Sequence, residues 1–169
     1  TGAAASAIGV SQAAVFRHFP TKAAMWLAVA DHVAGELTIA WERALAGTDD
    51  PIGRLTALVA AQLGQIAATP ALPMLLFSRE LNVCNEDMRA AFRGLLMRFQ
   101  ALIVTEVARG QEGDRLRRDV APADAAVLLT SLVQGMAIRW SLGARDFSLI
   151  EEGVRLLDVQ LRLLAVKGD

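Results

Sequence analysis

Apolar residues recur along this chain at intervals of three and four positions, which is the repeat of one face of an α-helix. The alternation of apolar and polar residues that marks a half-buried strand is nearly absent, and the chain has no tyrosine. The pattern therefore predicts an all-helical protein. The predicted helices are residues 12–17, 21–46, 51–68, 73–81, the segment from Asn85 to a polar loop at 109–122, and then 122–142 and 148–165, behind an Ala-rich stretch at 1–7.

Residues that favour helix ends support these boundaries. Thr21 and Asp50 each precede a periodic segment, and their side-chain oxygens suit the N-cap position, where they accept hydrogen bonds from free backbone N–H groups. Pro51 follows at the first helical position, where a missing N–H is not needed. Ser148 and Glu151 have the spacing of a capping box. The caps thus predict helix starts independently of the apolar stripes.

The composition is typical of a folded globular protein. The 169 residues are 54% hydrophobic, which is enough for a sizeable core, and the single cysteine, Cys84, excludes an internal disulfide. An uncharged run at residues 125–138 is shorter than the roughly 18 apolar residues of a membrane span, so we expect a buried helix there. The first residues have no basic segment of the kind that begins a signal peptide. We expect a cytoplasmic protein.

Catalytic and metal-binding patterns are missing from the sequence. It contains no phosphate-binding glycine loop, nucleophile elbow or H-E-x-x-H zinc motif. The two histidines, His18 and His32, have no neighbouring ligand at metal spacing. Glu151 and Glu152 are adjacent, so their side chains diverge by about 100° on a helix and make poor acid–base partners. We therefore expect no enzyme activity, no cofactor and no metal.

One short segment, GVSQAAVFRHFPTK at residues 9–22, has the layout of the second half of a helix-turn-helix. Gly9 permits the positive φ of a tight turn, Ser11 caps a short helix, and Phe19-Pro20 ends it. Residues 1–30 contain no Asp or Glu, so the basic side chains there could face phosphates. An ordinary corner of a helical bundle fits the same spacing, so both interpretations stay open at this point.

The outer face of that short helix carries side chains with known base-reading chemistry. Gln pairs with adenine and Arg with guanine through two hydrogen bonds, and a small Ala permits contact with a thymine methyl group. Ser and Lys near the helix ends suit phosphate oxygens. The predicted DNA-contacting residues are Ser11, Gln12, Ala13, Phe16, Arg17, His18 and Lys22.

The same stretch resembles the DNA-binding signature of the TetR family of transcriptional regulators, which reads roughly G-V-S-x-x-x-[LV]-[YF]-x-[HY]-F-x-[ST]-K-x-x-[LM]. The matching residues are Gly9, Val10, Ser11, Val15, Phe16, His18, Phe19, Thr21, Lys22 and Met25. Two positions are unusual. Phe16 lacks the hydroxyl of the more common Tyr, which often reaches phosphate, and Ile8 stands where a small residue is usual.

The resemblance implies an N-terminal helix-turn-helix domain with its connecting helix at residues 1–46 and a larger helical domain for ligand binding and dimerisation at residues 47–169. In the family scheme one further helix precedes the Ala-rich stretch. The resemblance also implies a homodimer on a near-palindromic DNA site, acting as a repressor that a small molecule releases. Two alternatives stay open. One is a ligand-independent, nucleoid-associated DNA-binding factor, and the other is a helical interaction module that does not bind DNA.

The last two predicted helices are apolar around most of their circumference. This width exceeds the stripe of an ordinary surface helix and favours a four-helix interface between two protomers, although two central core helices would show the same pattern. The predicted interface residues are Met136, Val154, Leu157 and Leu161.

The resemblance places a ligand pocket among the middle helices, behind the helix at residues 21–46. The residues available there indicate a mostly apolar molecule held by one or two hydrogen bonds, in a cavity of about 300–1,000 Å³. Each of these residues could equally fill the core. The predicted ligand-contacting residues are Leu63, Ile66, Phe77, Phe92, Phe99, Gln134 and Trp140, with Gln62, Leu95 and Arg139 as further candidates.

Overall fold

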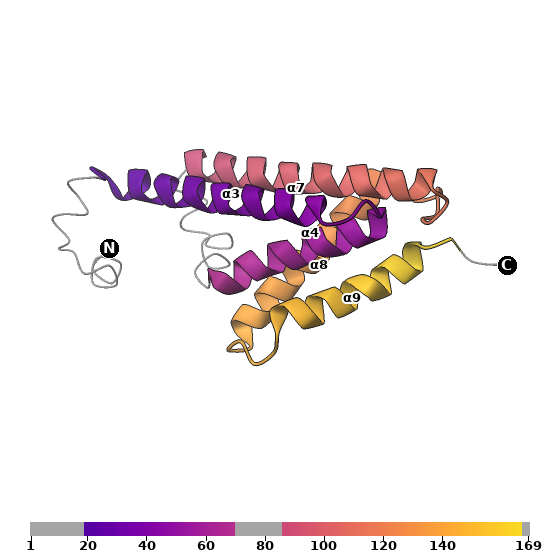
Figure 1. Cartoon of the computed structure of the whole chain (residues 1–169). Coiled ribbons are helices and arrows are strands. Elements are labelled where there is room, and N and C mark those ends of the chain that lie inside the picture. Colours follow the sequence, from indigo (N-terminus) through magenta and orange to yellow (C-terminus); the bar gives the residue numbers. More distant parts are fainter. Residues whose placement is uncertain (1–18, 70–85, 167–169) are drawn as a thin grey trace.

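The computed structural model describes residues 19–69 and 86–166, and every regular element in them is an α-helix (Figure 1). The helices are α3 (Lys22–Ala46), α4 (Pro51–Ala68), α7 (Glu86–Glu112), α8 (Pro122–Leu142) and α9 (Leu149–Leu164). One isolated antiparallel bridge pairs Leu116 with Ala165. The all-helical prediction is confirmed, while the predicted helices at 12–17 and 73–81 lie outside the described residues.

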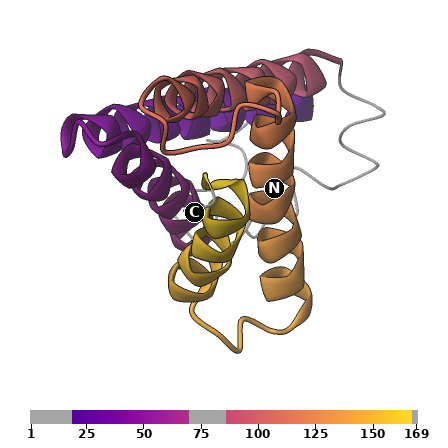
Figure 2. The same ribbon diagram turned by 90° about the vertical axis from the view of Figure 1, so that its right-hand side faces the viewer.

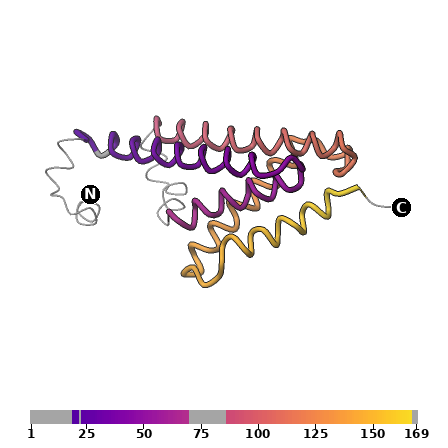
Figure 3. Tube along the Cα trace, viewed as in Figure 1, coloured from indigo at the N-terminus to yellow at the C-terminus, as the bar shows by residue number. Residues whose placement is uncertain are grey.

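Two long helices, α3 and α7, lie along one another and form one side of the molecule (Figures 1 and 3). The other three helices extend from that side as a second group, which Figure 2 shows from the end. Helix α4 contacts α3, α7, α8 and α9, so it lies at the centre of the packing. The last two helices, α8 and α9, pack against each other and against α4.

Helices α3, α4 and α9 start directly after the residues predicted as their N-caps. The Oγ1 of Thr21 accepts a hydrogen bond from the backbone N–H of Ala24 at 3.0 Å, and the Oδ2 of Asp50 accepts one from Gly53 at 2.8 Å. The side chain of Ser148 caps α9 in the same way. Each cap satisfies a backbone N–H that has no partner inside its helix, so these local sequences determine where α3, α4 and α9 start.

One predicted boundary is wrong. The helix α7 continues to Glu112, four residues into the loop predicted at 109–122. The glycine that indicates a loop there, Gly110, is buried inside the helix, because the side chain of Leu116 folds over it. A Cβ atom at position 110 would lie only 2.8 Å from Leu116 Cδ1. The glycine therefore permits a close approach rather than a break in the helix.

A single hydrophobic core joins the five described helices. The start of α3 also carries a second, small cluster in which Met25 packs with Phe19 and Trp26. Farther along the same helix, Leu37 and Trp41 are buried in the main core. The domain division after residue 46 stays a prediction. The structure adds that α3 belongs to both clusters and connects them.

Helix α8 is less buried than the sequence predicts. It is the one described helix that is long and apolar enough to cross a membrane by length and composition, and 44% of its most apolar window is buried in the protein. Core helices of soluble proteins pass the same test. Its exposed apolar side chains are Val127, Leu128, Ile138 and Leu142. The expectation of a buried helix at 125–138 is therefore wrong for its outer half.

Candidate functional site

The predicted DNA-contacting residues lie at the edge of what the structure describes. Ser11, Gln12, Ala13, Phe16, Arg17 and His18 lie outside the described residues, and Lys22 is described only as the first residue of α3. Their contacts with DNA stay predictions. The structure does describe the junction, because the Thr21 cap starts α3 directly after Phe19-Pro20. A movement of α3 would therefore also displace Phe19-Pro20, which ends the segment with the predicted DNA-contacting residues.

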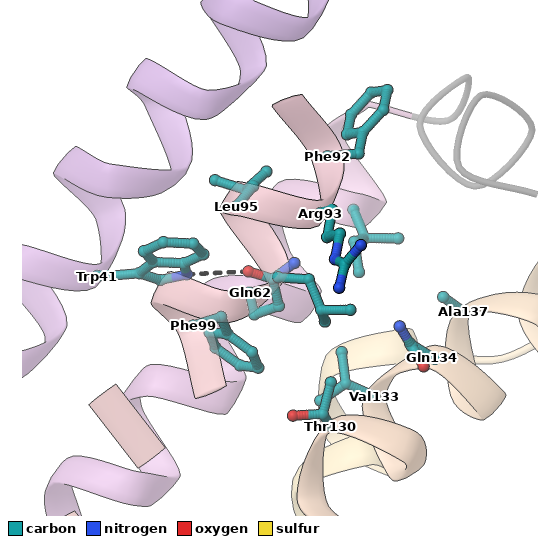
Figure 4. A pocket seen from close by; sticks show the side chains of 12 residues that line it. Trp41, Gln62, Phe92, Arg93, Leu95, Phe99, Thr130, Val133, Gln134 and Ala137 are labelled. Atoms are coloured by element: carbon teal, nitrogen blue, oxygen red, sulfur yellow. Dashed lines mark hydrogen bonds between the residues drawn. The ribbon is translucent and has the colours of Figure 1, made fainter. Parts of the chain in front are cut away.

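A cavity of about 230 Å³ lies between α3, α4, α7 and α8 (Figure 4). Its walls are mostly apolar and include three aromatic rings. The lining residues are Trp41, Gln62, Ile66, Phe92, Arg93, Leu95, Leu96, Phe99, Thr130, Val133, Gln134 and Ala137. The volume is below the range of about 300–1,000 Å³ expected from the sequence, so the described walls fit a small molecule.

The structure brings four of the predicted ligand-contacting residues together in this wall. Ile66 comes from α4, Phe92 and Phe99 from α7, and Gln134 from α8. Phe92 and Phe99 are seven residues apart and therefore lie on one face of their helix, as their spacing predicts. Because the four residues come from three helices, only the packing of those helices makes them neighbours.

Other candidates lie elsewhere. Leu63 is fully buried in the core and is not part of the cavity wall, and Phe77 lies outside the described residues. Trp140 is also buried away from the cavity, and its indole N–H donates to the backbone oxygen of Phe147 at 3.2 Å. Arg139 lies over the Phe147 ring at 5.0 Å from its centre. Trp140 and Arg139 therefore contact the turn between α8 and α9 and are not among the described residues of the cavity wall.

Six residues of the wall are absent from the sequence prediction, namely Trp41, Arg93, Leu96, Thr130, Val133 and Ala137. Trp41 belongs to the apolar stripe of its helix, and spacing cannot separate a core tryptophan from one that borders a cavity. Arg93 is one position off an apolar stripe, where a solvated side chain is the ordinary interpretation. Thr130 donates to the Ala126 carbonyl at 2.7 Å, so it keeps acceptor capacity only.

Trp41 connects the walls of the cavity. Its indole N–H donates to Oε1 of Gln62 at 2.9 Å, which joins α3 to α4 (Figure 4). Its ring also packs against Phe99 of α7, with ring centroids 5.3 Å apart and tilted by 34°. The amide NH₂ group of Gln62 has no hydrogen-bond partner among the described residues. Because its oxygen accepts from Trp41, Gln62 can offer only its N–H donors to a molecule in the cavity.

A second polar cluster lies where α4 meets the C-terminal half of α7. The Glu106 side chain is only 3% exposed and forms ion pairs with Nε of Arg54 at 2.9 Å and Nη1 of Arg109 at 3.0 Å. Arg109 also donates to the backbone oxygen of Asp49 at 3.2 Å. A buried carboxylate with two cationic partners is in the setting that such a charge requires. This cluster joins α4 to α7.

The predicted dimer-interface residues lie mainly inside the protomer. Leu157 is fully buried, Met136 and Leu161 are nearly so, and Val154 is half-buried. Their sides of α8 and α9 face the core. There α9 approaches α4 so closely that a Cβ atom at Gly153 would lie 2.3 Å from the Leu63 side chain. The large apolar side chains of these two helices that remain exposed are Val127, Leu128, Ile138, Leu142, Ile150 and Leu163.

Charge pairs on the surface stabilise the junction of α8 and α9. Arg155 binds Glu152 through two hydrogen bonds of 2.8 Å and lowers the pKa of that carboxyl group. Arg139 of α8 lies 3.9 Å from the same carboxylate and lowers its pKa further. Among the described residues, no group of three or more His, Cys, Asp or Glu side chains could hold a metal ion.

Comparison with known sequences identifies the helical domain. Residues 51–165, from the start of α4 to just after the end of α9, match the family described as BetI-type transcriptional repressor, C-terminal. Over 135 residues the chain is 26% identical to the nucleoid occlusion factor SlmA of Marinomonas sp. (strain MWYL1), which covers 80% of this chain and 68% of that protein. The chain thus spans about two thirds of the length of that relative.

Solved structures share the fold. The TetR family transcriptional regulator PfmR from Thermus thermophilus superposes with a TM-score of 0.76 at 24% identity, over 94% of this chain and 85% of that one. The ketosteroid transcriptional regulator KstR2 of Mycobacterium tuberculosis gives a TM-score of 0.80 at 15% identity, over 96% and 83%. Together with the family match over most of its length, this arrangement of helices shows that the chain belongs to the TetR family of transcriptional regulators, with a C-terminal domain of the BetI type.

Proposed function

We propose that this chain is a homodimeric, cytoplasmic repressor without enzyme activity. It binds a near-palindromic DNA site through residues 11–18 and releases it when a small, mostly apolar molecule fills the cavity. The observation that carries this proposal is the place of Trp41. Its side chain borders the cavity, and its helix, α3, continues directly from the segment expected to contact DNA.

Because α3 is long, a small tilt at one end produces a larger displacement at the other end. Its 25 residues span about 38 Å, at about 1.5 Å per residue. Trp41 lies near one end, and the small cluster of Met25, Phe19 and Trp26 lies at the other. A ligand that displaces Trp41 would tilt the helix, and its far end would move the most. In a dimer this would change the separation of the two DNA-reading helices, which must match the spacing of two half-sites.

The exposed side of α8 supports the homodimer. Leu128, Ser131, Gly135, Ile138 and Leu142 follow one another at three- and four-residue spacing, and all five are exposed. The row carries no charge, and nothing lies within 4 Å of the position a Cβ atom would take at Gly135. An uncharged row with a small residue near its middle allows a second helix to approach closely. We propose that this row meets its copy in the partner protomer.

A cavity-filling substitution tests the ligand-controlled repressor. Ala137 is a small residue of α8 in the cavity wall, and a phenylalanine side chain at this position would occupy the space. We expect Ala137→Phe in the full-length protein to bind a selected operator as tightly as the parent but to lose release by any inducer. Ala46→Phe, at an exposed position at the end of α3, is the control. Normal induction of the Ala137→Phe protein would contradict the proposal.

Substitutions in the exposed row of α8 test the dimer without unfolding the protomer. Leu142 is 83% exposed and Ile138 is 37% exposed, so lysine at both positions leaves the core intact. We expect the double variant to sediment as a folded monomer and to bind operator weakly, while the parent sediments as a dimer. A double variant that stays dimeric would place the interface elsewhere.

A second candidate function rests on the curated relative, which is a nucleoid occlusion factor. A DNA-binding protein of that kind need not respond to a small molecule. The two candidates differ in one measurement. If the full-length parent binds DNA and no compound that occupies the cavity changes that affinity, the nucleoid-associated function is the better description.

A further inference from the structure

The charge on the described wall of the cavity is positive. Among the described residues that line it, Arg93 is the one charged residue, and none is an Asp or a Glu. The remaining polar groups are the amides of Gln62 and Gln134 and the hydroxyl of Thr130. The other described residues of the wall are apolar. A molecule in this space therefore meets one cation and two amides within an otherwise hydrophobic wall.

Arg93 has no counter-ion among the described residues. The positions three and four residues away on α7 are Arg89, Ala90, Leu96 and Met97, so its own helix offers it no carboxylate. Most arginines of the described part of the chain are paired, as Arg54 and Arg109 are with Glu106. Arg93 is therefore an exposed arginine without an ion pair among the described residues, and it borders a mostly apolar cavity.

The guanidinium group is aimed at the cavity. Figure 4 shows the Arg93 side chain between α7 and α8, directed toward the Gln134 side. A guanidinium presents its N–H groups as a planar fork that fits the two oxygens of a carboxylate, and an amide can donate to the same oxygens. At the opposite side of the wall, the packed rings of Trp41 and Phe99 offer an apolar surface. The two ends of the cavity therefore favour opposite ends of one amphipathic molecule.

From this arrangement we propose that the molecule sensed by this protein is a small monocarboxylate with an apolar alkyl or aryl body. Its carboxylate binds Arg93, and its body lies against Trp41 and Phe99. The inference rests on the proposed ligand control and adds the charge of the ligand to it. The volume of about 230 Å³ restricts the body to a short chain or a single ring.

Direct binding measurements on the full-length protein test the inference. The probes are octanoate with its neutral analogue octanol, and 4-phenylbutyrate with 4-phenylbutyramide, measured by calorimetry without DNA. We expect each carboxylate to bind the parent about tenfold or more tightly than its neutral analogue, because a charge-assisted hydrogen bond is stronger than a neutral one. Raising the salt from about 0.1 M to about 1 M should reduce this preference, since the Debye length falls from about 10 Å to about 3 Å.

Two charge-neutralising variants assign the preference to one residue. Arg93→Gln should bind the carboxylates about tenfold more weakly and the neutral analogues as the parent does. Arg98→Gln is the matched control, because Arg98 lies on the same helix and contributes to a surface groove with Thr38 and Leu102 instead of the cavity.

Three results would overturn the inference: equal binding of acids and neutral analogues, an unchanged preference in Arg93→Gln, or no binding of either carboxylate at millimolar concentration. Tight binding of the neutral probes with operator release would leave the proposed function standing. Failure of the unliganded full-length protein to bind an operator would remove the proposed function, whatever calorimetry shows.

Discussion

The two halves of α7 differ in whether their charged side chains have ion-pair partners among the described residues. In the C-terminal half, the buried carboxylate of Glu106 forms ion pairs with Arg54 and Arg109. In the N-terminal half, Arg93 borders a cavity and has no carboxylate partner among the described residues. The buried charge of Glu106 therefore stabilises the packing of α4 against α7. Arg93 is exposed and costs little without an ion pair, so its charge remains available to the ligand proposed above.

The largest expected change in stability comes from breaking the ion pairs of Glu106 with Arg54 and Arg109. Glu106→Gln removes the one negative charge between two arginines, and removal of one member of a buried ion pair costs about 3–5 kcal/mol. We expect about 3 kcal/mol, at the lower end, because Arg109 is 40% exposed and is partly hydrated when unpaired. Chemical denaturation of the parent and the variant measures the loss. Glu112→Gln, at the exposed end of the same helix, should change little.

A smaller effect is expected at the cavity wall. Gln62→Leu removes the acceptor of the Trp41 indole N–H and leaves that group without its partner, which costs about 1–2 kcal/mol. The tryptophan emission should also shift as the hydrogen bond is lost. Gln65→Leu, on the same helix and outside the cavity wall, is the control. An unchanged stability would show that Trp41 is not joined to α4 by this bond.

A weaker effect, confined to acid solution, is expected from Glu152. Its pKa is lowered in the folded protein by the hydrogen bonds from Arg155, so its contribution to stability is complete above its unfolded pKa of about 4.3. That contribution is lost as the pH falls through the lower pKa of the folded state. The difference in Tm between the parent and Glu152→Gln should therefore shrink on acidification. A difference that stays constant from neutral pH to about pH 3 would contradict this assignment.

The smallest effect is expected from Arg93 itself in the absence of ligand. Because Arg93 has no ion-pair partner among the described residues, Arg93→Gln should change the free energy of unfolding by no more than about 0.5 kcal/mol. Denaturation of this variant beside Glu106→Gln tests the contrast between the two halves of α7 directly. A large loss of stability in Arg93→Gln would mean that its charge already has a structural partner.

Much of the helical layout is readable from the chain, because helix ends depend on nearby residues. Thr21, Asp50 and Ser148 bind backbone groups three residues away, so a short window of sequence contains both partners of each cap. The family, too, is readable in the stretch at 9–22. Gly110 was predicted to lie in a loop but lies inside α7, because its close neighbour is not in the same short stretch of helix. Its partner is the Leu116 side chain, which folds over the end of α7, and composition alone makes the same glycine a loop signal.

The candidate site depends on contacts between distant parts of the chain. Trp41 and Gln62 are 21 residues apart, and Glu106 finds Arg54 on a different helix. A helical stripe shows which side of a helix is apolar, and it predicted Phe92, Phe99 and Ile66 correctly as inward residues. It cannot show whether an inward side chain meets another side chain or an empty space. That outcome depends on how α3, α4, α7 and α8 fill the volume between them. The same packing buries Leu157 and leaves Leu142 exposed.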